Sequence, residues 1–191
     1  MMGGGYVSNA GVFLVNTLFG LYIGAVMLRL LLQLTRADFY NPLSQAIVRL
    51  TNPVLRPLRR YIPAVGKIDS ASVLLMVVLQ IVNVWIVGAM LGLRLGLPAL
   101  LVATVGELLS KFVYLYMFAI IIQAVASWVA PGSYNPVLGL IGSVTEPLLR
   151  PIRRILPNLG GLDLSPLVAI VLLQLVLMLV VAPLGGLARP F

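Results

Sequence analysis

The sequence contains no histidine and no cysteine, and only five of its 191 residues are acidic. Without histidine and cysteine, the chain can form no disulfide, no Cys/His zinc site and no mechanism that uses a histidine base. The sequence also lacks a P-loop, a paired-carboxylate site, a selectivity-filter motif and a cluster of metal ligands. We therefore expect neither an enzyme nor a bound cofactor or metal ion.

Charge of either sign is scarce, and long apolar runs take its place. Charged residues make up 9% of the chain and hydrophobic residues 61%, whereas soluble domains carry about 25% charged residues. Four apolar stretches, at residues 10–34, 70–93, 111–129 and 164–184, can each cross a bilayer as a helix, which takes about 20 residues. The first is too long for the core of a cleaved signal peptide. The sequence predicts an all-α membrane protein with four transmembrane helices.

The chain contains an internal repeat. A shift of 94 residues aligns 40–82 with 134–176, and 18 of these 43 positions are identical. The identities include prolines, arginines and aspartates, which a shared apolar composition would not bring into register. We predict a first repeat at 10–93, an interfacial segment at 94–110 and a second repeat at 111–184. Each repeat is a hairpin of two spans, so both have the same orientation, and we expect a pseudo-twofold axis along the membrane normal.

The loop inside each hairpin combines apolar residues at helical spacing with prolines. Leu43, Ile47 and Leu50 predict a short amphipathic helix in the plane of the lipid headgroups. Pro53 and Pro57 are expected to interrupt that helix, because proline lacks an amide hydrogen and restricts the residue before it. We therefore expect a rigid basic loop that is kinked or extended.

The distribution of basic residues predicts the orientation of the chain. Seven lie between Arg29 and Lys67 and three between Arg150 and Arg154, whereas the opposite face carries three in all. The positive-inside rule then places both loops in the cytoplasm and both termini outside. Arg29 lies within the first span and must extend its side chain to the interface to contribute. Because these residues lie between spans, we assign the net charge of +8 to anionic lipids and not to nucleic acid.

Each loop presents three arginines for which two interpretations are open. They are a topology signal that also contacts anionic lipids, worth about 1 kcal/mol per residue, or a docking site for a partner or anionic ligand. Asp69 and Asp163 precede the second span of each repeat. They are expected to cap those helices, and the alternative is an ion pair with the arginines of the same repeat.

Two glutamines occupy equivalent positions near the middle of their spans, Gln80 and Gln174. A polar amide in lipid is expected to bond to another helix, for about 0.6–2 kcal/mol. A pseudo-twofold axis could bring the two together, as a path for an ion or solute would need. No acidic residue lies deep in a span, which argues against a proton-coupled transporter.

The duplicated pattern N-P…T-x-P-x-L-R-P-x-R-R-x-x-P…G-x-x-D resembles the YggT family of bacterial integral membrane proteins, in its two-repeat proteobacterial form. YlmG-type proteins and plastid relatives are similar to it. The resemblance implies a bacterial inner (plasma) membrane location and links to osmotic-shock tolerance, potassium homeostasis, division and cytochrome maturation, but no catalytic residue. Arg29 aligns with Gln123 and Asp38 with Gly132, so we expect no role shared by both repeats there. The residues that match the family signature are the candidate site: Arg56, Pro57, Arg59, Arg60, Asp69, Arg150, Pro151, Arg153, Arg154 and Asp163.

Two functions fit these features. The first is a non-enzymatic inner-membrane accessory or scaffold protein that supports the assembly or localisation of membrane machinery. Its partners would be anionic lipids, with other membrane proteins or self-association as further options. The alternative is a small channel or a component of osmotic-stress and potassium homeostasis, passing ions between Gln80 and Gln174.

Overall fold

The computed structural model describes residues 3–129, 135–156 and 163–187, and these ranges are helical apart from short connections. Val65 and Ile68 pair across the α2–α3 turn, where Gly66 has a positive φ of 61°. The helices, in chain order, are α1 (Gly3–Leu34), α2 (Pro42–Tyr61), α3 (Ser70–Met90), α4 (Leu97–Val129), α5 (Pro136–Ile155), α6 (Ser165–Val176), the π-helix η1 (Leu177–Val181) and α7 (Ala182–Leu187).

Four helical segments have the length and composition of membrane spans, as the sequence predicts. They are Tyr6–Leu34, Ser70–Met90, Leu97–Ser127 and Ser165–Gly185, and the last runs through α6, η1 and α7. Each presents much apolar surface outward, which suits lipid as the surrounding solvent. The all-α membrane class is thus confirmed.

The third span is longer than predicted. Helix α4 runs without a break from Leu97 to Val129, so residues 97–110 of the predicted interfacial segment belong to the same helix as the third span. Pro98 stands in the first turn, where a missing amide hydrogen costs no hydrogen bond. Glu107 and Lys111 pair at 2.8 Å one turn apart within the helix. These two charges interrupt the apolar run in the sequence but not the helix.

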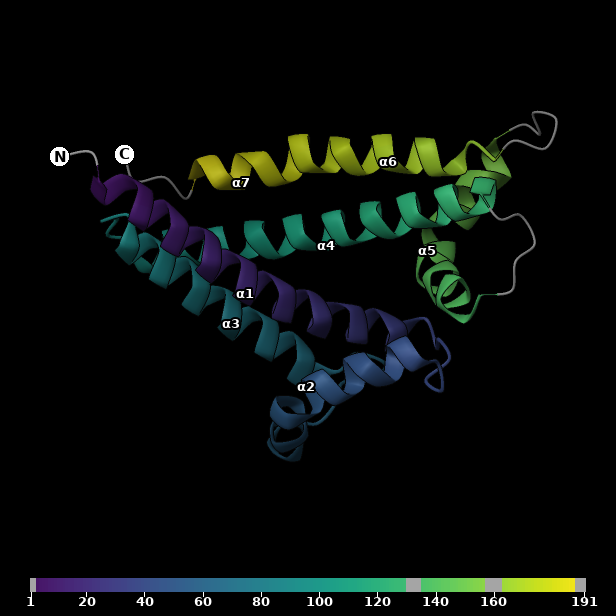
Figure 1. Ribbon diagram of the computed structural model, residues 1–191, viewed down its shortest axis with the longest axis horizontal. Coiled ribbons are helices and arrows are strands. Elements are labelled where there is room, and N and C mark those ends of the chain that lie inside the picture. The colour runs from purple at the N-terminus through teal and green to yellow at the C-terminus, as the bar shows by residue number, and fades with distance from the viewer. Residues whose placement is uncertain (1–2, 130–134, 157–162, 188–191) are drawn as a thin grey trace.

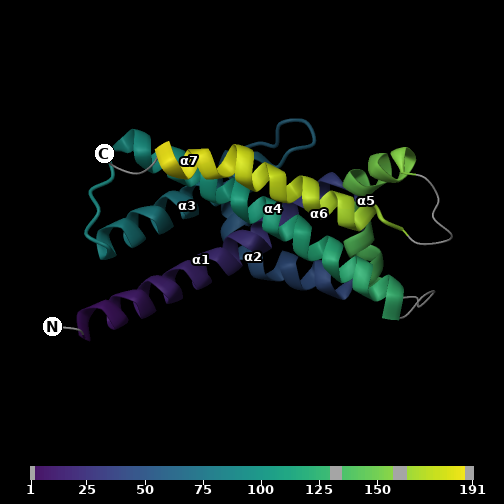
Figure 2. The same ribbon diagram turned by 90° about the horizontal axis from the view of Figure 1, so that it is seen from above.

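The helices that contain the basic residues lie away from the start of α1 and the end of α7. Figure 1 shows α5 at the right end of the molecule and α2 along its lower edge, nearer the middle. Helix α4 is central: it packs against α1 and α3 on one side and against α5, α6, η1 and α7 on the other. Figure 2 shows α6 and α7 lying along α4.

Both basic segments are helices throughout, which excludes the extended form of the predicted loop and leaves the kinked form. Pro53 and Pro57 lie inside α2, and Pro147 and Pro151 inside α5. All four prolines are on the exposed face, so the backbone carbonyls that lose a partner point away from the protein interior. Figure 1 shows both helices changing direction along their length, as proline-containing helices do.

The two repeats contact each other on one side only. Leu31 and Leu32 of α1 share a buried cluster with Leu140 and Val144 of α5. A twofold axis would repeat the α1–α5 contact between α4 and α2. It would likewise repeat the α3–α4 contact between α6 and α1. Neither pair packs together to a comparable extent in the described ranges. The expected pseudo-twofold relation is therefore wrong, because the contact is not reciprocal.

Candidate functional site

Helix α2 rests on the protein through one narrow face. Ser44, Ile47, Thr51 and Leu55 are buried and recur every three or four residues, which places them in one stripe. Asn41 caps the helix by accepting a hydrogen bond from the backbone amide of the residue two positions later, at 2.9 Å. The opposite face, which carries arginines and prolines, is left exposed.

A buried threonine fastens each basic helix to the preceding span. Arg29 Nη1 donates to Thr51 Oγ1 at 2.6 Å, and only 5% of the Arg29 residue is exposed. In the second repeat Thr145 donates to the Gln123 side chain. The expectation that Arg29 extends to the interface is therefore wrong. Arg29 and its aligned residue Gln123 differ in type, but each forms a hydrogen bond with the equivalent threonine of its own repeat. The predicted absence of a shared role at this position is therefore also wrong.

Asp69 forms an ion pair and does not cap α3 with its side chain. Its carboxylate accepts hydrogen bonds from Arg59, whose Nε lies at 3.1 Å, and from Ser72 Oγ at 2.6 Å. Asp69 is 2% exposed and makes no side-chain bond to the first amides of α3. Capping was the favoured prediction, so for this residue the alternative is confirmed. The ion pair ties the C-terminal end of α2 to the start of α3.

Asp163 has both of the predicted roles. Its Oδ1 accepts from the backbone amide of Ser165 at 2.9 Å, and its Oδ2 accepts from Arg153 Nε at 2.8 Å. Arg153 Nη1 also reaches Glu146 Oε2 at 2.8 Å. The Asp163 side chain is 45% exposed, so this pair is more open to solvent than its counterpart in the first repeat.

The ionisation of these aspartates makes the stability of the loops dependent on pH. Burial opposes ionisation, but hydrogen bonds from Arg59 and Ser72 hold the pKa of Asp69 below its ordinary value. Burial is likewise outweighed at Asp163, whose pKa is lowered by hydrogen bonds from Ser165 and Arg153. A carboxyl group with a lowered folded pKa stabilises the fold fully above its unfolded pKa, about 3.9, and loses that contribution as the pH falls through the folded value.

We therefore expect the thermal midpoint in detergent to be level between about pH 5 and 7 and to fall below about pH 4. The Asp69→Asn variant should start lower and show a smaller drop over the same range. A midpoint that rises on acidification would contradict the assignment of these ion pairs.

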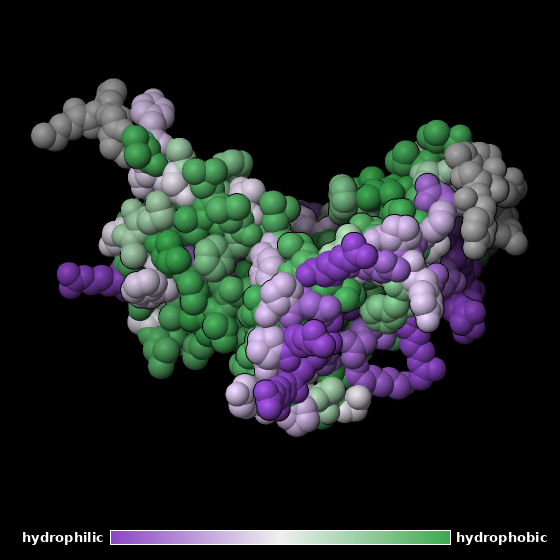
Figure 3. Space-filling model, turned by 60° about the horizontal axis from the view of Figure 1, so that its bottom comes forward, coloured by the Kyte–Doolittle hydropathy of each residue, from purple (hydrophilic) through white to green (hydrophobic). Residues whose placement is uncertain are grey.

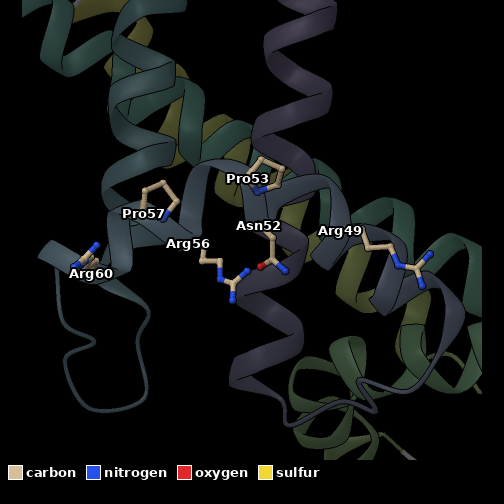
Figure 4. Close-up of a pocket in the computed structure, with 6 residues that line it drawn as sticks. All are labelled: Arg49, Asn52, Pro53, Arg56, Pro57 and Arg60. Atoms are coloured by element: carbon tan, nitrogen blue, oxygen red, sulfur yellow. The ribbon is translucent and has the colours of Figure 1, made fainter.

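Three arginines share the exposed face of α2. Arg49, Arg56 and Arg60 are spaced by seven and four residues and line one open groove of about 650 Å³, together with Asn52, Pro53 and Pro57. Figure 4 shows the three side chains spread along the outer face of the helix. Arg59 does not line the groove, because it pairs with Asp69. Figure 3 shows the hydrophilic surface gathered over this end of the molecule, with apolar surface beside it.

The same face of α5 is less basic. The counterparts of Arg49 and Asn52, 94 positions later, are Ser143 and Glu146. Glu146 lies 3.9 Å from Arg150 as well as pairing with Arg153. Among the residues that the structure describes, the groove of α2 is thus lined by three arginines and no acid, whereas the matching face of α5 has two arginines and a carboxylate.

The two mid-span glutamines have different surroundings. Gln80 is fully buried, and its Nε2 lies 3.4 Å from Asn83 Oδ1. Gln174 is exposed on α6. The expectation that an axis brings them together is not met, so they do not form a common polar path.

The predicted arginines, prolines and aspartates of the two basic segments thus separate into two groups. Arg59, Asp69, Arg153 and Asp163 form ion pairs that hold the basic helices in place. Arg56, Pro57 and Arg60, with Arg150, Pro151 and Arg154, are exposed. Sequence reasoning missed Arg49, Asn52 and Glu146, although the spacing of 49, 56 and 60 marks one helical face once the prolines are allowed inside the helix.

Comparison with known proteins gives one family. The family model described as CCB3/YggT matches the chain twice, over residues 8–90 and 102–184. An uncharacterized protein of Pseudomonas aeruginosa is 48% identical over 177 residues, covering 92% of this chain and 90% of that protein. The uncharacterized protein YggT of Escherichia coli (strain K12) is 38% identical over 168 residues, covering 88% of this chain and 87% of the relative. No solved structure matches the chain.

These relatives carry no enzymatic name, and the double match reproduces the internal repeat of the sequence. The family resemblance that the proline and arginine register indicates is confirmed over most of the chain. The chain belongs to the CCB3/YggT family of membrane proteins, as a member with two copies of the family unit.

Proposed function

We propose that this chain is a non-enzymatic accessory protein of the bacterial inner membrane that supports the assembly or localisation of other membrane proteins. The basic face of α2, on the cytoplasmic side, would be the part that binds. The observation that carries the proposal is that the arginines of α2 have two different surroundings. Arg59 holds the helix in place, while Arg49, Arg56 and Arg60 line an exposed groove that has no acidic residue in its described lining.

The chemistry of this groove favours anionic groups of membrane partners. Guanidinium groups bind carboxylates and phosphates through paired hydrogen bonds. The groove is fixed at both ends, by the Thr51 bond to α1 and the Arg59 pair with α3, so little order has to be gained on binding. The face of α5 serves as an internal comparison, because Glu146 already occupies Arg150 and Arg153 there.

The channel alternative has no comparable support. Its motivation was a polar path between the two mid-span glutamines, and these do not face each other. The remaining links to osmotic stress and potassium come from the family resemblance alone.

A pair of matched variants tests the proposal. We expect Arg56→Glu with Arg60→Glu to abolish the capture of membrane proteins by this chain in crosslinked membranes, because both reverse the charge of the groove. Arg150→Glu with Arg154→Glu, at the positions 94 residues later, should leave most of the capture intact. Unchanged capture by the first variant, or recovery of lipid alone with the unaltered chain, would contradict the scaffold function.

Charge reversal can also invert a span, so the orientation has to be checked in the same membranes. The chain has no native cysteine, and a single cysteine at Val65, which is 72% exposed in the α2–α3 turn, would report the side on which that turn lies. Only variants with the original labelling pattern count in the comparison.

A further inference from the structure

The contact between the two repeats buries one side of each repeat. On the α1–α2 side, Leu31 is 4% exposed, and on the α4–α5 side Leu140 is 4% and Val144 2% exposed. Leu43 and Leu115 pack against the same cluster from the two sides. This repeat interface is therefore an apolar contact between a first-repeat surface and a different second-repeat surface.

The equivalent surfaces on the other side of each repeat are apolar but uncovered. Val125, the counterpart of Leu31, is 49% exposed, and Val137, the counterpart of Leu43, is 37% exposed. In the first repeat, Leu50 and Leu21 are the counterparts of Val144 and Leu115, and they are 56% and 70% exposed. Ala46, the counterpart of Leu140, is exposed as well. Each repeat thus carries one used and one unused half of the same interface.

We propose that these unused halves bind each other between copies of the chain. The Leu21, Ala46 and Leu50 surface of one copy packs against the Val125 and Val137 surface of a second copy. The contact continues the repeat interface across chains. The contact is heterologous, since two different surfaces meet. If each added copy uses the same contact, the copies form a closed ring when the rotation from one repeat to the next divides a full turn.

A polar contact at the repeat interface supports a protein occupant over lipid. Asn41 Nδ2 donates to the backbone carbonyl of Pro136 at 2.6 Å, from the α2 cap to the start of α5. Asn135 caps α5 through the same bond to the amide two residues later, at 2.9 Å, and is exposed. Its amide is placed to donate to the carbonyl of Pro42 in the second copy. Lipid could cover the apolar positions, whereas a second copy would in addition supply the acceptor that Asn41 finds in Pro136.

Cysteine pairing tests both the contact and its direction. Ala46→Cys and Val137→Cys place thiols at the counterparts of Leu140 and Leu43, and the absence of native cysteine makes every disulfide assignable. When the two variants are co-expressed and their membranes are oxidised, we expect a disulfide-linked dimer. Either variant alone should give none, because in a heterologous contact each residue meets a different one. A dimer from a single variant would show an isologous contact and overturn the proposal.

The intrachain interface provides the control. Leu43→Cys with Leu140→Cys in one chain should close an internal disulfide under the same oxidation. If that disulfide closes and the mixed membranes still give no dimer, the proposal is wrong and lipid covers these surfaces.

A second variant measures assembly without a crosslink. Val125→Trp enlarges an exposed side chain and should not disturb the fold, but it blocks the surface that receives the second copy. We expect the native chain to have the mass of a multimer in nanodiscs and the Val125→Trp chain to have that of a monomer. A native chain that is monomeric would equally overturn the proposal.

Discussion

Replacement of Thr51 by valine is expected to lower the free energy of unfolding by about 2–4 kcal/mol, because it leaves a buried cation without its main partner. Thr51 Oγ1 accepts from Arg29 at 2.6 Å, and the other acceptor of that guanidinium, the Val48 carbonyl, is at 3.5 Å. Thermal or denaturant unfolding in detergent would measure the loss.

Two further variants separate the lost bond from a general defect. Arg29→Gln copies the second repeat, where Gln123 holds Thr145, and should cost no more than about 1 kcal/mol. In an Arg29→Leu background, the Thr51→Val change should cost less than about 1 kcal/mol, because no unpaired cation remains. Equal losses with and without Arg29 would show that the threonine acts by some route other than this bond.

Replacement of Asp69 by asparagine should have the second largest effect, about 2 kcal/mol. The change leaves Arg59 without its carboxylate at a position where Asp69 is 2% exposed. The matched change in the second repeat, Asp163→Asn, should cost less than about 1 kcal/mol, since that pair is partly open to solvent and Arg153 keeps Glu146.

The same unfolding measurement in detergent at pH 7 compares the two variants. A loss at Asp163 equal to that at Asp69 would mean that burial does not set the strength of these pairs. Loss of partner capture by Asp69→Asn is expected in addition, because Arg59 positions the helix that carries the groove.

The architecture was largely predictable, because the signals are long and independent of context. Hydropathy predicts four spans, and the duplicated prolines and arginines predict the repeat. The start of α4 was missed because Glu107 and Lys111 interrupt the apolar run, although charges one turn apart can pair within a helix. The contact between repeats was not predictable, since both surfaces of each repeat have the same apolar composition.

The candidate site was only half predictable. The arginines and aspartates were identified from their register in the repeat. Which arginine pairs with which aspartate depends on the faces of α2 and α5 on which the arginines lie. Because Pro53 and Pro57 were read as helix breakers, the common face of Arg49, Arg56 and Arg60 was not recognised. The bond between Arg29 and Thr51 joins residues 22 positions apart, and no local pattern predicts it.

The prolines of the two basic helices have a consequence for the depth of the protein in the bilayer. Pro53 and Pro57 supply no amide hydrogen to the carbonyls of Arg49 and Pro53, and Pro147 and Pro151 leave those of Ser143 and Pro147 without one. An unpaired carbonyl is costly in hydrocarbon and is satisfied by water. These four oxygen atoms therefore mark positions that must be hydrated, and together they fix how far α2 and α5 can sink toward the acyl chains.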